Sequence, residues 1–282
     1  MTQNSQLQHS GSERTRSVRT AKAEPLVELM RSESVDSEPQ RETPAEPGRT
    51  FRFSDASDTT EWTALQLDTL YSRVGRRLFD LSLLAVFGLP ALLIGCAIAG
   101  LNLVQFRSFS KIFFVQDRVG YRGEVFSILK FRTMGEVRGG NFESWSNGGD
   151  QVRVTRIGRL LRNTHLDELP QLINVALGDM AFVGPRPEMV EIEEWASGEI
   201  EGFSTRLAIP PGVSGYAQIT QGYTTNDVAA YGEKFRVSDW YRRHQSFSLD
   251  LKIIAMTLIW MVRGRGWQWN AKGEKPKVEL PD

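Results

Sequence analysis

The feature that most constrains this chain is an apolar run over residues 81–106, LSLLAVFGLPALLIGCAIAGLNLVQF, in which no side chain is charged. As an α-helix the run would extend about 39 Å, which exceeds the ~30 Å apolar core of a bilayer. The alternative, a buried helix of a soluble protein, rarely stays uncharged over such a length. We therefore predict that this segment enters a membrane.

Two features of the run argue against a straight crossing. Pro90 removes a helical hydrogen bond and clashes with the preceding turn, so the helix should bend or break there. The arm 81–89 would then reach only about 14 Å. Basic residues flank both ends of the run: Arg73, Arg76, Arg77, Arg107 and Lys111. Because such residues favour the cytoplasm, residues 71–110 are predicted to form a re-entrant helix–break–helix hairpin; a kinked transmembrane helix is the alternative.

An acidic residue, Asp80, lies at the edge of the apolar run. A carboxylate at this depth needs a partner, and Arg76 or Arg77 on the preceding turn is the candidate. Ser82 is a candidate for binding the backbone groups that Pro90 leaves without a helical hydrogen bond.

Composition excludes several classes of protein. Over 282 residues, 34 Lys and Arg balance 34 Asp and Glu, so the chain lacks the overall basic charge of a nucleic-acid-binding protein. Cys96 is the only cysteine, which excludes an internal disulfide and cysteine-rich zinc sites and fits a reducing compartment such as the cytosol. The sequence contains no P-loop or dinucleotide-binding glycine motif, and its three histidines lack metal-ligand spacing.

The ends of the chain are predicted to be a disordered arm over residues 1–70 and a flexible tail over residues 271–282. Residues 1–50 contain no Phe, Trp or Tyr and are rich in Ser, Glu, Arg, Thr and Pro. Such a segment buries too little apolar surface to offset its conformational entropy. Within the arm, Pro25–Met30 is a weak candidate for a docking helix.

Residues 111–270 are predicted to form an α+β domain that is mainly helical with short strands. Apolar runs between turn residues indicate strands at 113–116, 126–131 and 181–183, and helices at 155–162, 169–177 and 189–195. Gly120 and Gly123 permit positive φ in the turn between the first two strands. Residues 253–262 are too short to span a bilayer and are expected to form an interfacial amphipathic helix, with a core helix as the alternative.

The densest set of reactive side chains lies in residues 155–188, TRIGRLLRNTHLDELPQLINVALGDMAFVGPRPE. Three arginines recur every third residue, so they project from one helical face and can clamp phosphate oxygens: Arg156, Arg159 and Arg162. Asp167 and Glu168 follow near a predicted helix start, where a carboxylate can act as nucleophile, general base or Mg²⁺ ligand. Such a pair can also be a solvated helix cap.

Three further basic residues are candidates for the same phosphate site. Arg186 lies between two prolines that restrict the backbone, so its side chain is pre-organised for an anion, unless the segment is simply a rigid surface turn. Lys130 and Arg132 alternate along a strand and would point to one face; a charged strand edge is the alternative. His165 is a candidate base, with an exposed turn histidine as the simpler interpretation.

These motifs occur in an order that is similar to a known family. RRLFD, the proline-interrupted membrane segment, FVQDRVGYRGEVFSILKFRTM, the 155–188 segment and PPGVSGYAQITQG resemble the bacterial sugar transferases called monotopic phosphoglycosyl transferases. The resemblance covers about residues 73–265. It implies transfer of a sugar-1-phosphate from a nucleoside diphosphate sugar, typically a uridine one, to polyprenyl (undecaprenyl) phosphate at the cytoplasmic face of the bacterial inner membrane, the first membrane step of exopolysaccharide or glycan assembly.

The resemblance also implies roles for particular residues. Asp167 would attack the phosphate that carries the sugar and form a covalent aspartyl-phosphosugar intermediate. Glu168 would associate with Mg²⁺ or with the acceptor. Basic residues at the family's phosphate-binding and Lys-Phe-Arg-Thr-Met positions are Arg162, Arg186, Lys130 and Arg132. The membrane-hairpin anchor falls on Arg77 and Asp80.

One departure from the family concerns the helix break. Many relatives have Ser-Pro there, whereas this chain has Leu89 before Pro90, so no serine repairs the interrupted hydrogen bonding. The segment 215–227 is expected to line the sugar pocket. Partners that the sequence leaves open are a second copy of the chain and downstream glycosyltransferases.

Two other functions are compatible with parts of this pattern. A non-catalytic membrane-anchored scaffold would use the arginines to bind anionic lipid, but it gives no role to Asp167, Glu168 and Arg186 together. A glycosyltransferase that moves the sugar without its phosphate is the other. The nucleotide product distinguishes them, because phosphosugar transfer releases UMP and sugar transfer releases UDP.

Overall fold

The computed structural model describes residues 65–67, 69–135, 153–221, 227–262 and 280. Contacts divide the chain into Met1–Pro44 and Ala45–Asp282, and every described residue belongs to the second unit. The predicted arm, apart from its last few residues, and the predicted tail, apart from residue 280, therefore lie outside the described residues. The same holds for residues 222–226 of the expected sugar-pocket segment.

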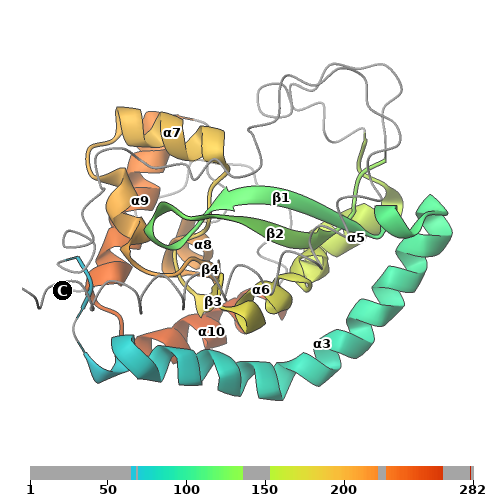
Figure 1. Cartoon of the computed structure of the whole chain (residues 1–282), viewed down its shortest axis with the longest axis horizontal. Helices are drawn as coiled ribbons and strands as arrows, with labels where there is room; N and C mark the ends of the chain where they lie inside the picture. Colours follow the sequence, from blue (N-terminus) through green and yellow to red (C-terminus); the bar gives the residue numbers. More distant parts are fainter. Residues whose placement is uncertain (1–64, 68, 136–152, 222–226, 263–279, 281–282) are drawn as a thin grey trace, which may run out of the picture. The chain divides into compact units, whose positions relative to one another are not determined.

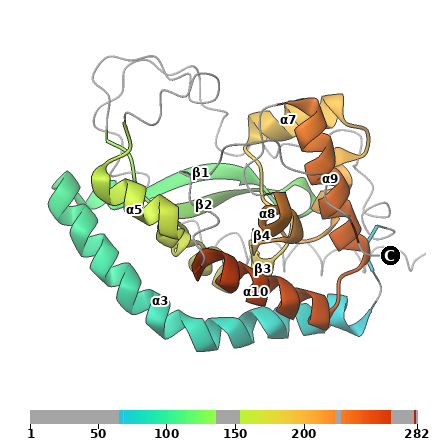
Figure 2. The same ribbon diagram turned by 180° about the vertical axis from the view of Figure 1, so that it is seen from behind.

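One long helix dominates the described part of the chain. Helix α3 (Arg76–Phe106) follows a π-helical turn, η1 (Tyr71–Gly75), and continues through Pro90. Figures 1 and 2 show it as a single bent helix. The predicted break is thus a bend, because a proline removes one donor and displaces one carbonyl, and the hydrogen-bond ladder resumes beyond it. Only 6% of the apolar window of this helix is buried, and among the described residues it alone is long and apolar enough to cross a membrane.

Two strands form the predicted hairpin. Strand β1 (Phe113–Val119) pairs antiparallel with β2 (Val125–Phe131), with Val119 opposite Val125. Between them lies a 3-10 turn, η3 (Tyr121–Gly123). Gly123 has the expected positive φ of 77° and Gly120 does not, because the second left-handed residue is Arg122 at φ 56°.

A second, smaller sheet pairs segments that are distant in sequence. Strand β3 (Ala181–Val183) was expected; its parallel partner β4 (Gly212–Ser214) was not. The two backbone segments approach so closely that a Cβ on Gly212 would lie 2.0 Å from the Gly184 nitrogen. Glycine at position 212 is therefore required for this pairing.

Helices pack against both sheets (Figures 1 and 2). In chain order the helical elements after α3 are η2 (Phe109–Lys111), α5 (Arg156–Thr164), η4 (Leu166–Glu168), α6 (Gln171–Leu177), α7 (Val190–Glu199), η5 (Phe203–Ala208), α8 (Tyr216–Gln221), α9 (Val228–Arg243) and α10 (Phe247–Val262). The three helices expected around residues 155–195 are confirmed, with shifted ends. Helix α9 was missed, although Asp227 caps it by accepting a hydrogen bond from the Ala230 nitrogen at 2.8 Å.

The main core joins the start of α3 to helices α9 and α10. Phe79 of α3 packs in one cluster with Val183 of β3, Tyr241 of α9 and Ile253 of α10. Helix α10 lies beside the first half of α3 in both views of the ribbon. It buries Ile253 and exposes apolar side chains elsewhere: Phe247, Leu251, Leu258 and Ile259. The segment expected to be interfacial is thus a core helix on one face, with a second apolar face left exposed.

Candidate active site

The site begins with the placement of α5. Thr155 caps this helix by accepting a hydrogen bond from the Gly158 nitrogen at 2.9 Å. Gly158 lies against Thr133 just beyond β2, and a Cβ there would be 2.0 Å from the Thr133 oxygen. One turn later, Arg162 Nε donates to Thr133 Oγ1 at 2.9 Å. The glycine contact therefore brings the last turn of α5, with Arg162, to the end of the hairpin.

The acidic pair lies in the tight turn between α5 and α6. His165 ends α5 in the left-handed conformation, with φ 55°, and η4 carries Asp167 and Glu168 before Pro170 starts the next helix. The turn reverses the chain against β2, which faces η4. Asp167 is only 9% exposed. The pair is therefore part of the folded site and not a solvated helix cap.

Glu168 is held by two cations. Its Oε1 accepts hydrogen bonds from Lys130 Nζ and from Arg186 Nη2, each at 2.8 Å. Burial by itself would raise the pKa of Glu168, but the charges and hydrogen bonds of Arg186 and Lys130 outweigh it and hold the pKa well below its usual range. Glu168 is therefore ionised, and one of its oxygens is already bound.

The pKa of Asp167 is shifted in the opposite direction. Burial, followed by the negative charge of Glu168, raises its pKa to about 6, against the smaller effects of Lys130, Arg162 and Arg186. Within the described part of the chain, no hydrogen bond engages its carboxylate. Of the two neighbouring carboxylates, Asp167 is thus the one whose oxygens are available for nucleophilic attack near neutral pH.

The backbone of the Pro-Arg-Pro-Glu segment is held at every carbonyl. Four consecutive oxygens each accept a hydrogen bond: Pro185 from Gly212 N (2.9 Å), Arg186 from Arg206 Nη1 (3.1 Å), Pro187 from Arg118 Nη1 (3.4 Å) and Glu188 from Val119 N (2.9 Å). Two of these donors are main-chain amides and two are buried or half-buried arginines. The segment is therefore a rigid support for Arg186 and not a free surface turn.

A second set of charges lies behind this support and was missed in the sequence. Arg206 of η5 forms an ion pair with Glu193 of α7, and Lys234 of α9 forms one with Glu188. Glu193 is fully buried. Glu188 directly follows the Pro-Arg-Pro motif and could have been suspected, but nothing local marks the other three residues as its neighbours.

A pocket of about 510 Å³ opens beside Glu168 and Arg186. Its polar end also includes His165, Glu188 and Lys234. Apolar side chains from the middle of α3 and from α10 also line it: Phe87, Pro90, Ala91, Ile94, Ile254, Leu258 and Met261. Part of α8 lines it as well, including Gln218 and Gln221 of the expected sugar-pocket segment. Charged side chains and the long apolar helix α3 thus line one pocket.

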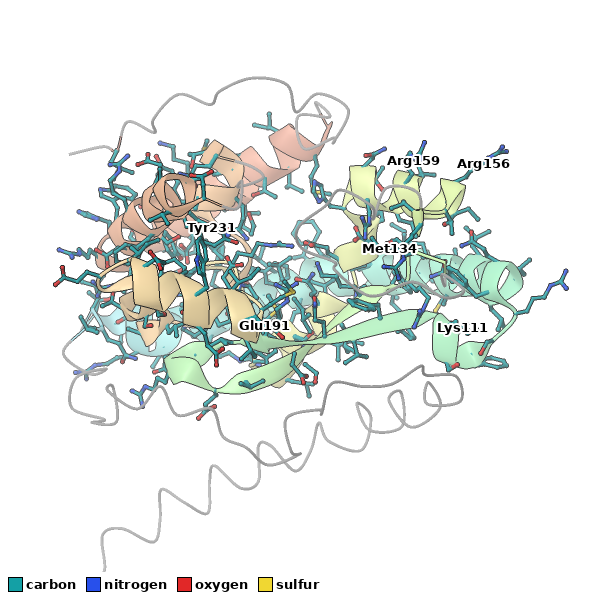
Figure 3. All side chains as sticks on the ribbon, turned by 90° about the horizontal axis from the view of Figure 1, so that it is seen from above. Lys111, Met134, Arg156, Arg159, Glu191 and Tyr231 are labelled. Carbon is teal, nitrogen blue, oxygen red and sulfur yellow. The ribbon has the colours of Figure 1, made fainter. Side chains whose placement is uncertain are left out.

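The structure separates the predicted phosphate-binding residues into two groups. Lys130, Arg162 and Arg186 act on the acidic pair, whereas Arg132 is not among the groups with the strongest charge effects on it. Arg156 and Arg159 are exposed and point away from the ribbon in Figure 3. The three helix arginines therefore do not share one environment, because three-residue spacing rotates successive side chains by about 60° around the helix.

His165 differs from the simpler of its two interpretations. It is half-buried and lines the pocket next to Glu168, so it is not an exposed turn residue. Burial lowers its pKa, against the opposing charge of Glu168. The imidazole is therefore mainly neutral at neutral pH.

The anchor residues at the start of α3 contact the domain and do not pair with each other. Arg77 donates to the Val175 and Ala176 oxygens at 2.6 and 2.7 Å, at the end of α6. Asp80 accepts from the Phe182 nitrogen at 2.9 Å in β3. The expected partner Arg76 instead donates to Gln245 and to the Val183 oxygen. Ser82, expected near the proline bend, donates to the Phe79 oxygen at 2.7 Å.

Comparison with known proteins agrees with this site. A family model described as bacterial sugar transferase matches residues 71–264. EpsL of Bacillus subtilis, an uncharacterized sugar transferase, is 37% identical over 198 residues, which cover 68% of this chain and 90% of that protein. The UDP-glucose:undecaprenyl-phosphate glucose-1-phosphate transferase of Escherichia coli is 36% identical, and the UDP-N-acetylgalactosamine-undecaprenyl-phosphate N-acetylgalactosaminephosphotransferase of Aeromonas hydrophila is 35% identical.

The matched segments cover 68% and 58% of this chain, respectively, but only 42% and 38% of those two enzymes. The match to the family model, in contrast, includes the long helix, the acidic pair, the Pro-Arg-Pro-Glu segment and all of α10. On this evidence the chain belongs to the bacterial sugar transferase family.

Proposed function

We propose that this protein transfers a sugar-1-phosphate from a nucleoside diphosphate sugar, in particular a UDP-sugar, to undecaprenyl or another polyprenyl phosphate. The observation that carries the proposal is the contrast between the two neighbouring carboxylates. Glu168 is ionised and bound by two cations, while Asp167 is engaged by no described residue and has a pKa of about 6. Relatives at 35–36% identity are named for such reactions.

The reaction follows from this arrangement. The diphosphate of the donor binds near Arg162 and Arg186, whose charges reduce its repulsion of an approaching carboxylate. An Asp167 oxygen attacks the phosphorus that carries the sugar, an Asp–O–P bond forms, and the bond to the nucleoside monophosphate breaks. The terminal phosphate of the polyprenyl acceptor then attacks the same phosphorus. This second step transfers the phosphosugar to the lipid and restores the Asp167 carboxylate.

The shape of the pocket supports a lipid acceptor. Its charged end at Glu168, Arg186 and Lys234 suits a phosphate, and its apolar wall from α3 and α10 suits an isoprenoid chain. A soluble, polar acceptor would gain no favourable contact from the apolar side chains that the proposed membrane helix α3 contributes to the pocket. The acceptor would therefore enter from the bilayer along α3.

Mg²⁺ fits the residues that are present. Protein sites for Mg²⁺ typically supply one or two carboxylates, and substrate phosphates and water complete the shell. Asp167 and Glu168 provide that number, and no group of three or more His, Cys, Asp or Glu residues suited to a metal occurs in the described ranges. Glu168 is the proposed ligand; when bound, Mg²⁺ would neutralise charge on the diphosphate.

The packing of α3 supports a hairpin at the cytoplasmic face. Its first turn binds the domain through Arg77 and Asp80, and near its other end Asn102 donates to the Ile112 and Arg132 oxygens at 3.0 Å. A helix that crossed the bilayer would place its two ends about 30 Å apart on opposite sides, so they could not both bind one domain. The arms on either side of Pro90 would reach only about 21 and 24 Å.

The nucleotide product tests the proposed reaction. Purified protein is incubated with polyprenyl phosphate, Mg²⁺ and a panel of UDP-sugars, and the released nucleotide is separated and quantified. Release of UMP that requires the lipid acceptor for multiple turnovers is the expected result. Release of UDP would indicate transfer of the sugar alone, and release of neither nucleotide with any sugar of the panel would favour a scaffold; both results would contradict the proposal.

A further inference from the structure

Lys234 of α9 lines the pocket together with its carboxylate partner Glu188. The side chain of Lys234 is 14% exposed, and its ammonium lies over the ring of Tyr231, 4.9 Å from the ring centre and one turn earlier on the same helix (Figure 3). An ammonium carries three N–H donors, whereas the described residues supply one acceptor for it, a Glu188 oxygen. Lys234 therefore has donors left for a ligand in the pocket.

The surroundings of Glu188 hold more positive charge than this one carboxylate neutralises. Burial would raise its pKa, but three neighbouring cations lower it: Lys234, Arg206 and Arg118. Arg206 has a carboxylate of its own in Glu193. Arg118 donates to a main-chain oxygen and to a glutamine side chain, and to no carboxylate of the described residues. Buried charges are stable only when they are compensated, so the excess indicates that an anionic ligand completes this end of the pocket.

Arg186 links Lys234 to the acidic pair. It donates to Glu168, the neighbour of Asp167, at 2.8 Å, and two residues further along the chain Glu188 binds Lys234. The charge of Arg186 acts on both Asp167 and Lys234. A phosphorus atom held at Arg186 would therefore have the acidic pair toward one side and Lys234 toward the other.

The geometry of phosphoryl transfer gives that second position a use in both steps. The attacking and leaving oxygens lie roughly in line, on opposite sides of the phosphorus. When Asp167 attacks, the phosphate of the nucleotide leaves from the side away from Asp167. When the acceptor phosphate then breaks the Asp–O–P bond, it attacks from that same side. The acceptor phosphate must therefore occupy the place that the nucleotide phosphate has left.

We propose that Lys234 is a phosphate subsite that binds the departing phosphate of UMP and then, once UMP has left, the phosphate of the polyprenyl acceptor. The inference rests on the proposed phosphosugar transfer, in which Arg162 and Arg186 hold the reacting phosphate. Glu188 orients the ammonium and, by neutralising part of its charge, weakens the binding of UMP, which has to leave before the acceptor enters. The apolar side chains of α3 and α10 in the same pocket then face the isoprenoid chain.

The test separates recognition of the phosphate from recognition of the nucleoside. For the full-length protein, the inhibition constants of uridine and UMP are measured as a ratio, together with the KM for polyprenyl phosphate. Lys234→Gln combined with Glu188→Gln removes both charges and keeps an amide pair, whereas Glu188→Gln alone keeps the cation. The matched control, Glu233→Gln with Arg236→Gln, removes a more exposed ion pair from the same helix. Thermal unfolding shows which variants are folded.

The double variant is expected to lower the preference for UMP over uridine by about tenfold or more, because a charge-assisted hydrogen bond is lost. The KM for polyprenyl phosphate should rise by a similar factor. Glu188→Gln alone should strengthen the preference for UMP, because it leaves the charge of Lys234 without its partner. The control should match the wild type in both quantities.

Either change without the other in the folded double variant would overturn the shared subsite. Unchanged values of both would overturn the role of Lys234 in binding and leave a structural ion pair between α9 and the Pro-Arg-Pro-Glu segment. If the double variant does not fold, Glu188→Gln decides, since a preference for UMP that does not rise contradicts the inference. A wild-type protein that releases UMP from no UDP-sugar contradicts the proposed reaction itself, and the subsite with it.

Discussion

Arg206 donates a hydrogen bond from Nη1 to the main-chain oxygen of Arg186 at 3.1 Å. The same guanidinium is buried, forms an ion pair with Glu193 and lies over the ring of Phe203, 4.4 Å from its centre. Arg206, which holds the main chain of the proposed phosphate-binding residue Arg186, is thus itself held by Glu193 and Phe203. We therefore expect Arg206 to be a positioning residue, which would affect a bound substrate only through Arg186.

Replacing Arg206 tests this role. Arg206→Met leaves the Glu193 carboxylate buried without its partner, which costs about 3–5 kcal/mol of folding stability. The double variant Arg206→Met, Glu193→Leu should recover much of that stability, because no lone charge remains. The KM for the UDP-sugar should stay raised in the double variant, because Arg186 still lacks its carbonyl contact. A refolded double variant with the wild-type KM would contradict the positioning role.

The identity of the nucleophile is tested by mass spectrometry of the intact protein. Incubation with donor in the absence of acceptor should add one phosphosugar to the intact wild-type protein, and Asp167→Asn should abolish both this adduct and turnover, because an amide lacks the attacking charge. Asp117→Asn, at an exposed position of β1, is the matched control and should retain the adduct. An adduct of unchanged yield in Asp167→Asn would show that Asp167 is not the nucleophile.

The raised pKa of Asp167 predicts a pH-dependent stability difference. The folded carboxyl titrates at about 6 and the unfolded one at 3.8, so the folded state binds this proton more tightly. Ionisation of Asp167 therefore destabilises the fold by an amount that is zero below pH 3.8 and complete above pH 6, on the order of 2–3 kcal/mol. Asp167→Asn, compared with wild type by denaturant unfolding in detergent, should be more stable at pH 8, with the difference vanishing toward pH 4. Equal stabilities of the two proteins at pH 8 would mean that burial does not raise the pKa of Asp167.

Topology is tested by thiol accessibility. With Cys96→Ser, single cysteines at positions 73 and 111 should be protected from a membrane-impermeant thiol reagent in intact cells and react after lysis, because both ends of α3 bind one domain. Reaction of either position with the reagent outside intact cells would contradict the re-entrant membrane hairpin. Pro90→Ala should favour a straighter helix, because it restores a backbone donor and removes the ring clash.

The N-terminal arm is predicted from composition to be dispensable for catalysis. Deletion of residues 2–50 should leave UMP release unchanged and remove the most protease-sensitive part of the chain. A large loss of turnover would mean that the arm packs on the catalytic domain. The serines near SESVDSE, at positions 32, 34 and 37, are candidate regulatory phosphorylation sites that the same deletion would remove.

Local patterns predicted much of the fold correctly. The hairpin strands, β3 and the helices around the acidic pair were confirmed, because each depends on alternation, capping or turn residues within a few positions. Thr155 is such a case, since it was expected to begin a helix and serves as its cap. Strand β4 and helix α9 were missed because three-residue strands and weakly amphipathic helices carry little local signal.

The sequence by itself determined the apolar run, the proline bend and the positions of the acidic pair and the Pro-Arg-Pro motif, since these follow from the chemistry of adjacent residues. Only the tertiary structure decided which cations reach which carboxylate. Lys130, Arg162 and Arg186 come from three separate segments, and charge effects depend on distance and burial, which residue spacing does not encode. Tertiary packing also leaves Arg156 and Arg159 exposed. Burial and the neighbouring charges give Asp167 and Glu168, which are adjacent in sequence, opposite pKa shifts.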